Sequence, residues 1–317
     1  MPHADRPAPT LARVTPPPLV CCGLATLDVV QRVERLPGPD EKLVALGLTV
    51  TFGGPAANAA ATAAALGVPA VLVTALGAGP VARLVSDRLA AAGVRVVDLA
   101  AGAPGDPAVS AVLVTASTGQ RAVVSTNATG WPDDLGAAAA RAAEDVLDGA
   151  GAVLVDGHHL AAGIAVAGAA RRRGVVVLAD GGSWKPGLER LLAHVDVAIL
   201  SADLVVPVGD ADPGGGGAAD GLLDAVAALG PSFVARSAGA GPVRVRLASG
   251  AYDEVTPPAV APAEVVDTLG AGDVLHGATG AALARGLDPL ASLREAVVLA
   301  TESVRHPGAL GWAAVSR

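Results

Sequence analysis

The chain has 317 residues and a formal net charge of −8 at pH 7, and 52% of its residues are hydrophobic although it contains only three Trp, one Tyr and two Phe. The acidic balance argues against nucleic-acid binding, which needs a basic surface, and Gly, Pro and Arg break the Ala-rich stretches before they reach the length of a membrane span. The hydrophobicity therefore comes from Ala, Val and Leu, which suits helices packed closely on a buried parallel sheet.

The first residues of the chain and its two cysteines indicate the cellular compartment. Residues 1–18 contain several prolines and two arginines but no apolar segment, so we expect a disordered tail rather than a secretory signal. Cys21 and Cys22 are adjacent within an apolar run, which predicts buried strand residues rather than a disulfide framework or a metal site. Together these features predict a cytoplasmic protein.

Taken in chain order, short apolar runs predict strands, and Ala/Leu-periodic runs predict helices between them. The strands are expected at Leu19–Gly23, Ala70–Leu76, Val94–Leu99, Ala152–Val155, Val175–Ala179, Val197–Leu200 and Ser232–Ala235. The helices are expected at Asn58–Leu66, Pro80–Ala92, Leu135–Leu147, Ala161–Arg173, Ala218–Leu229, Asp273–Arg285 and Pro289–Val304. This alternation predicts an α/β protein with a doubly wound, mostly parallel sheet and helices on both faces. Val29–Phe52 and Ala108–Asn127 break the rhythm and are expected to form exposed β-hairpins or strands.

The segment Val266–Gly277, with the sequence VDTLGAGDVLHG, places a carboxylate directly behind a turn of small residues that opens a helix. Gly270, Ala271 and Gly272 allow the sharp turn, and unpaired N–H groups at a helix start attract anions. Asp273 should stand among these groups, where the helix dipole would lower its pKa and keep it ionised, able to accept a proton from an alcohol. The alternative is that Asp273 only caps the helix, but a cap requires neither the Gly-Ala-Gly turn nor the preceding Asp-Thr pair. The segment therefore favours phosphoryl transfer.

Two motifs give the chain a resemblance to a known family, the ribokinase-like (PfkB) carbohydrate kinases. Asp267 to Asp273 matches the family's D-T-x-G-A-G-D signature completely, and Gly53-Gly54 followed by Asn58 matches its second signature more than two hundred positions earlier. The resemblance runs from about residue 20 to residue 312. Within the family it is most similar to the ketohexokinases, over residues 23–28, 266–273 and 308–312.

The resemblance implies an ATP-dependent sugar kinase, with Mg²⁺ bridging the phosphates and a ketose such as fructose favoured as the acceptor of the γ-phosphoryl group. It implies one kinase domain over residues 19–317, in which the segments at about 29–52 and 108–127 form a β lid over the sugar, a surface that serves some members for homodimerisation. Its partners would be the small sugar and ATP, without nucleic acid or membrane. The residues that it implicates are Asp273 as base with Gly270, Ala271 and Gly272 as anion hole, Asp28, Gly53, Gly54 and Asn58 for the sugar, Lys185, Ala238, Gly241 and Gly308 for the nucleotide, and Asp267 and Thr268 for a monovalent cation, usually K⁺.

Three positions depart from the family pattern. Pro55 stands where many members carry a polar residue that contacts the sugar, so the substrate does not carry over with the motif. The N-x-x-E motif that acts on Mg²⁺ is absent after Val197–Leu200, where Asp203 stands one position away from the Glu. Ala238 replaces the first glycine of the nucleotide loop.

Two other functions remain open at the level of the sequence. Residues 77–82 satisfy the loose G-x-G-x-x-G/A pattern of a nicotinamide dinucleotide site, with Asp98 at about the right distance for a ribose contact, but this turn does not follow the first strand. A sugar-binding protein with a decayed kinase site is the other alternative, and the intact Asp273 argues against it. The adjacent His158 and His159 have no suitably spaced third ligand for a metal, and His276 is expected to be structural.

Overall fold

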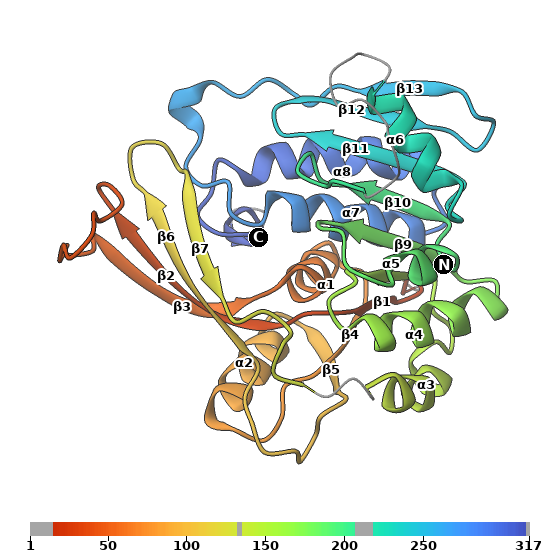
Figure 1. Cartoon of the computed structure of the whole chain (residues 1–317), viewed down its shortest axis with the longest axis horizontal. Helices are drawn as coiled ribbons and strands as arrows, with labels where there is room; N and C mark the ends of the chain where they lie inside the picture. Colours follow the sequence, from red (N-terminus) through yellow and green to blue (C-terminus); the bar gives the residue numbers. More distant parts are fainter. Residues whose placement is uncertain (1–14, 132–134, 207–217, 315–317) are drawn as a thin grey trace, which may run out of the picture.

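The structure is a computed structural model that describes residues 15–131, 135–206 and 218–314. Its central sheet has the strand order β13-β12-β11-β10-β9-β8-β1-β4-β5 (Figure 1). Neighbouring strands pair in parallel from β11 through to β5, whereas β12 and β13 pair antiparallel at one edge. The strands are β1 (Leu19–Cys22), β4 (Ala70–Thr74), β5 (Val94–Asp98), β8 (Ala152–Val155), β9 (Val176–Gly181), β10 (Val197–Leu200), β11 (Phe233–Ala238), β12 (Gly241–Arg246) and β13 (Tyr252–Val255).

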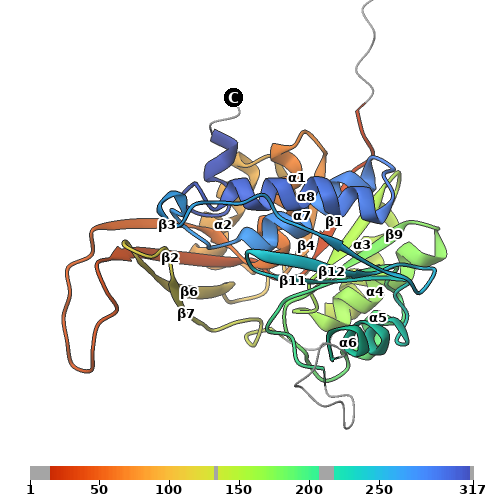
Figure 2. The same ribbon diagram turned by 90° about the horizontal axis from the view of Figure 1, so that it is seen from above.

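Helices cover both faces of this sheet, as the alternation of elements predicts (Figure 2). One face carries α1 (Pro55–Ala65), α2 (Pro80–Ala91), α7 (Ala271–Ala284) and α8 (Pro289–Ser303), and the other carries α3 (Leu135–Val146), α4 (Leu160–Arg172), α5 (Leu188–Leu192) and α6 (Ala218–Ala227). Short 3₁₀ turns lie at Pro262–Glu264 and Gly311–Ala314. Alternate residues of one strand serve the two cores, since Leu19 faces the first layer of helices and Val20 faces the second. The predicted doubly wound α/β fold is confirmed.

A second sheet of four strands, which we call the small sheet, projects from the edge of the molecule (Figure 1). Its strands are β2 (Thr26–Val33), β3 (Gly47–Gly53), β6 (Ala108–Thr115) and β7 (Arg121–Ser125), in the order β3-β2-β6-β7. The two segments that break the rhythm of the sequence thus form strands, and their antiparallel pairs join through the parallel pairing of β2 with β6. Because β2 begins at Thr26, Asp28 lies inside a strand of the small sheet and not in the connection after β1.

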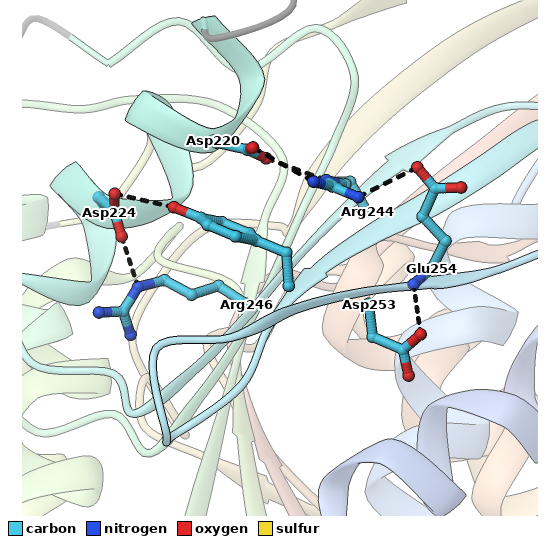
Figure 3. Close-up of polar contacts among 7 residues, drawn as sticks. Asp220, Asp224, Arg244, Arg246, Asp253 and Glu254 are labelled. Atoms are coloured by element: carbon cyan, nitrogen blue, oxygen red, sulfur yellow. Dashed lines mark hydrogen bonds and ion pairs between the residues drawn. The ribbon is translucent and has the colours of Figure 1, made fainter.

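The edge strands β12 and β13 and the short helix α5 are absent from the elements expected from the sequence. Val243 and Val245 are buried and alternate with Arg244 and Arg246, so the period-2 signal of β12 was present. Both arginines pair with carboxylates of α6, Arg244 with Asp220 at 2.9 Å and Arg246 with Asp224 at 2.6 Å (Figure 3). β12 lies between β11 and β13, and its two arginines attach this side of the sheet to α6.

The expectations for the two cysteines and for the N-terminal segment can be compared with the structure. Cys21 and Cys22 are free and buried in β1, as expected. Of the expected tail, residues 1–14 lie outside the described residues, and residues 15–18 lead into β1. Within the described ranges, the structure contains no helix that is both long and apolar enough to cross a membrane.

A buried carboxylate, Asp156, holds together the segments that meet at the carboxyl end of β1. One oxygen accepts hydrogen bonds from the backbone N–H groups of Leu24 at 2.8 Å and Ala56 at 3.1 Å, and the other accepts one from His158 at 2.9 Å. These donors belong to the β1–β2 connection, to the start of α1 and to the loop after β8. Asp156 therefore fixes the start of the small sheet relative to the start of α1.

We expect Asp156→Ala to lower the free energy of unfolding by about 3 kcal/mol or more, because it leaves three backbone donors in or near the interior without their acceptor. Asp106→Ala is the matched control, since Asp106 is exposed and accepts hydrogen bonds from Val81 and Ala82 at the start of α2. Loss of such an exposed cap should cost about 1 kcal/mol. Urea unfolding of both variants measures the difference, and equal losses would contradict the role given to Asp156.

Candidate active site

The start of α7 provides an anion-binding turn next to a carboxylate. Gly270 precedes the helix with φ of 78°, in the left-handed region that favours glycine, and a Cβ there would overlap Ala309. Gly270 has no side chain to cap the helix, and the N–H of Ala271 lies 3.4 Å from the carbonyl oxygen of Thr268, so the N–H groups of Gly272 and Asp273 are those that the helix start presents to an anion. Asp273 is the third residue of the helix and not its cap, which removes the capping alternative.

The two sequence motifs meet in a single hydrogen bond. Asn58, on α1, donates from Nδ2 to Oδ2 of Asp273, on α7, at 2.6 Å across 215 positions of sequence. The helices can approach this closely because small residues line their contact: a Cβ on Gly277 would lie 2.5 Å from the carbonyl oxygen of Ala59. Asn58 is the fourth residue of α1, so it is not the cap of that helix either.

Burial and, to a smaller extent, the charge of Asp180 raise the pKa of Asp273 to about 7, net of the lowering effects of Asn58, His276 and Arg121. The sequence-based expectation of a lowered pKa was wrong, because withdrawal of the carboxylate from water outweighs the partial charge of the helix start. Above about pH 7 the carboxylate is ionised and can accept a proton. Below that pH it is protonated and cannot.

Asp28 lies on β2 with its carboxylate against the backbone of Gly53. A side chain at position 53 would overlap this carboxylate. Thr26 donates its hydroxyl proton to Oδ1 of Asp28 at 2.6 Å. Burial raises the pKa of Asp28, while hydrogen bonds from Thr26 and Ser110 lower it. The remaining lone pairs of this carboxylate suit the hydroxyl groups of a polyol.

A cavity of about 430 Å³ brings together two of the expected sugar residues, Asp28 and Asn58, with Asp267 and Gly308. Its wall combines β2, β3 and β6 of the small sheet with Asn58 of α1 and with the segments around Asp267 and Gly308. Asp28 and Asn58 both line it, and Asn58 in turn contacts Asp273. Gly54, with φ of 95°, packs its backbone against Leu24 beside this wall. Gly308 was expected on the nucleotide side, and the structure places it in the wall of this cavity.

Asp267 and Thr268, the expected cation ligands, are engaged with the protein itself. The carboxylate oxygens of Asp267 accept hydrogen bonds from the N–H groups of Leu269 at 2.8 Å and Gly308 at 2.9 Å. Arg121, on β7, donates to the carbonyl oxygen of Thr268 at 3.1 Å and approaches its hydroxyl at 3.4 Å. A guanidinium group thus lies against the oxygens of Thr268, and the donor set does not fit a bound K⁺ in this arrangement.

Apart from Gly308, the expected nucleotide residues lie in two places. Ala238 and Gly241 face each other where β11 turns into β12, at a tight hairpin. Lys185 follows β9, where burial lowers its pKa and the charges of Asp156 and Asp180 raise it. Asp203 is exposed just after β10, and its backbone N–H bonds to the hydroxyl of Ser201 at 3.2 Å.

The turn that resembles a dinucleotide site is already occupied by carboxylates of the chain. Asp98 accepts hydrogen bonds from the N–H groups of Leu76 at 2.8 Å and Gly77 at 3.1 Å, and Asp106 caps α2. The ring of Trp131 lies against Gly77, at the position where the pyrophosphate of a dinucleotide would have to approach the turn. Because the anion-binding groups of this turn are satisfied internally, it is a structural turn.

Several residues near the base were not singled out by sequence reasoning. Asp180 is the last residue but one of β9, and its Oδ2 lies 3.4 Å from Nδ1 of His276, with both side chains buried. Asp156, Asp180 and Arg121 each follow or flank a strand end, and the rule that parallel sheets bind ligands at the carboxyl ends of their strands could have selected the first two. Arg121 has no such signal, since only the folded hairpin brings it to Thr268.

The fold and this site define a phosphotransferase with an alcohol group as acceptor. The chain belongs to the PfkB family of carbohydrate kinases, whose model matches residues 17–313. It is 28% identical to ribokinase from Arabidopsis thaliana over 98% of this chain and 82% of that protein. The structure of Arabidopsis thaliana ribokinase complexed with ribose and ATP is similar with a TM-score of 0.73 at 25% identity, covering 94% of this chain and 96% of that one. Ribokinase from Giardia lamblia shares the fold with a TM-score of 0.76 at 16% identity, covering 93% and 95%.

We expect Asp28→Ala to raise the KM for the sugar far more than the KM for ATP, because each charge-assisted hydrogen bond that it loses is worth about 1.5 to 3 kcal/mol. Asp28→Asn keeps the shape and part of the hydrogen bonding, so its effect should be intermediate. Steady-state kinetics with each substrate varied in turn measures the split. Equal changes in both KM values would place Asp28 outside the sugar site.

Proposed function

We propose that the protein transfers the γ-phosphoryl group of ATP to a hydroxyl of a free sugar, with Asp273 as the general base. The observation that carries this proposal is the Asn58–Asp273 hydrogen bond, which connects the sugar cavity to the carboxylate beside the anion-binding turn. Asp28, Gly54 and Asn58 would bind the sugar, and the N–H groups of Gly270–Gly272 would hold the transferring phosphoryl group. A nicotinamide-dependent oxidoreductase is less well supported, because carboxylates of the chain already occupy the N–H groups of the dinucleotide-like turn. A sugar-binding protein with a decayed kinase site is less well supported, because Asp273 is present.

In this mechanism the chain orients the sugar hydroxyl towards Asp273, which accepts its proton as the oxygen attacks the γ-phosphorus. The bond between the γ-phosphorus and the β,γ-bridging oxygen breaks as the new bond forms, and ADP leaves with that oxygen. Negative charge that develops on the phosphoryl oxygens would be stabilised by the backbone N–H groups at the start of α7. Mg²⁺ neutralises phosphate charge when it is bound with ATP, and Asp203, exposed after β10, is the carboxylate that we propose to face it. Lys185 and the hairpin at Ala238 and Gly241 are proposed to contact the nucleotide.

Two free sugars are the proposed acceptors. Ribose is supported by the similarity to a ribokinase that binds it, and fructose by the ketohexokinase-like stretches of the sequence. The cavity of about 430 Å³ suits a ligand of this size, and its carboxylates Asp28 and Asp267 favour hydroxyl groups over phosphate. A sugar phosphate is the second class of candidate substrate, after the free sugars, because Arg32 also lines the cavity and could pair with an anion.

We expect a screen of ATP consumption to give rates with ribose or fructose at least about tenfold above those with sugar phosphates, whose phosphate would place a negative charge beside Asp28 and Asp267, and above those with nucleosides, whose base adds bulk to the sugar. The coupled assay should be run with Mg²⁺ over ketoses, aldoses, nucleosides and sugar phosphates. A preference for a sugar phosphate would assign Arg32 an anion-binding role, and Arg32→Ala would then abolish that preference.

We also propose that the small sheet acts as a lid over the sugar and as the surface of a homodimer. Leu48 and Val124, with 65% and 75% of their surface exposed, support this reading because large apolar side chains on a sheet gain by being covered.

The test of the function is Asp273→Asn, which keeps size and most hydrogen bonding but removes the proton acceptor. General-base catalysis contributes about 10²- to 10⁴-fold, so kcat should fall by that order while both KM values stay within a few fold. The matched control is Asp288→Asn, because Asp288 caps α8 through hydrogen bonds from Leu290 and Ala291 and Asn caps a helix equally well. A folded Asp273→Asn protein with activity within about tenfold of the parent would end the case for Asp273 as base.

A further inference from the structure

The tip of the β6–β7 hairpin touches the segment that leads into the anion-binding turn. Arg121 donates from Nη1 to the carbonyl oxygen of Thr268 at 3.1 Å, and the hydroxyl of Thr268 lies 3.4 Å from the carbonyl oxygen of Gly119. A Cβ on Gly119 would lie 3.3 Å from the carbonyl oxygen of Val266, so the hairpin backbone packs closely on this segment. The two contacting stretches lie 147 positions apart in sequence.

The partners of this contact are the residues expected to hold a monovalent cation. A K⁺ ion needs several oxygens that are turned towards one point, and a guanidinium group among those oxygens would repel it. The oxygens of Thr268 face the guanidinium group, and both carboxylate oxygens of Asp267 accept backbone N–H groups. A permanently charged side chain therefore lies where the resemblance implies a mobile ion.

We infer that the Arg121 guanidinium takes the place of the monovalent cation, so that this chain carries its own fixed positive charge beside the phosphate-binding turn and does not require K⁺. The inference rests on the proposed role of Asp273 and of the turn at Gly270–Gly272. Arg121 acts through the Thr268 segment and through its charge, so it is a positioning residue.

The electrostatics of the base agree with this placement. The groups that act on Asp273 are Asp180 of β9, Asn58 of α1, His276 of α7 and Arg121 of β7. Asp180 raises the pKa of Asp273 and Arg121 lowers it, so the charge of Arg121 reaches the base. Removal of that charge should therefore raise the pKa of Asp273 and move the acidic limb of the rate profile to higher pH.

The first measurement compares the parent protein in KCl and in choline chloride at equal ionic strength, which keeps screening constant. With ATP, Mg²⁺ and a sugar that the protein phosphorylates, we expect rates within about twofold in the two salts, because the required charge is already covalently attached. Activation of the parent by K⁺ of about tenfold or more would overturn the inference.

The second measurement uses Arg121→Gln, with Arg95→Gln as the matched control on the exposed surface of β5. Arg121→Gln should lower kcat about tenfold or more and shift the acidic limb of kcat/KM to higher pH, as expected for a positive charge lost from the neighbourhood of a carboxylate. Arg95→Gln should change neither. An Arg121→Gln protein with parental kcat and an unmoved acidic limb would overturn the inference.

A third measurement does not depend on turnover. The parent should unfold at the same temperature in KCl and choline chloride, whereas Arg121→Gln should be stabilised by KCl, because the oxygens of Thr268 become available to the ion. If Arg121→Gln does not fold, Arg121→Lys replaces it: it keeps a charge and should retain the position of the acidic limb. Asp273→Asn tests the base separately. If Asp273→Asn loses activity while Arg121→Gln keeps the acidic limb of the parent, this inference is refuted and the role of Asp273 is not.

Discussion

The site depends on how closely α1 and α7 can approach. An ordinary side chain at Gly277 would collide with the backbone of Ala59, so this contact is made between main chains with only small residues between them. At this separation the short side chain of Asn58 reaches Asp273, one turn before Gly277. Larger residues in α1 would move the helices apart by the width of a side chain, and the hydrogen bond between the two motifs would be lost. The Ala-rich composition of α1 is thus a geometric requirement of the site.

The same close packing creates an electrostatic difficulty that neighbouring charges offset. Exclusion of water from the carboxylate of Asp273 favours its neutral form, and the buried Asp180 adds a like charge nearby. Hydrogen bonding from Asn58 and the positive charge of Arg121 act in the opposite direction. The result is a carboxyl group that titrates near neutrality, which suits a base that must accept a proton in one step and release it in a later one.

The sequence predicted most of the central fold because local signals and the global arrangement agree there. Strands β8 and β10 occupy the predicted residues, and the ends of most helices differ by a few positions, as fraying ends do. The two motifs likewise selected Asn58 and Asp273, which the structure brings into contact. The contact of Arg121 with Thr268 could not be predicted, because it depends on where a hairpin tip rests after folding. The raised pKa of Asp273 escaped prediction for a similar reason: the dipole of a helix start is visible in sequence, whereas the depth of burial is not.

The position of β1 and α7 also has a consequence for the order in which the chain can become structured. β1 pairs with β4 and β8, and α7, near the end of the chain, covers α1 and contacts β1. During synthesis the ribosome would expose the small-residue face of α1 for more than two hundred residues of further elongation before α7 emerged to cover it. Contacts that span so much sequence slow folding, since the intervening loop must close before they form. The core around α1 can therefore close only after α7, in the last part of the chain, has been synthesised. The two helices that assemble the site thus also set when this core can form.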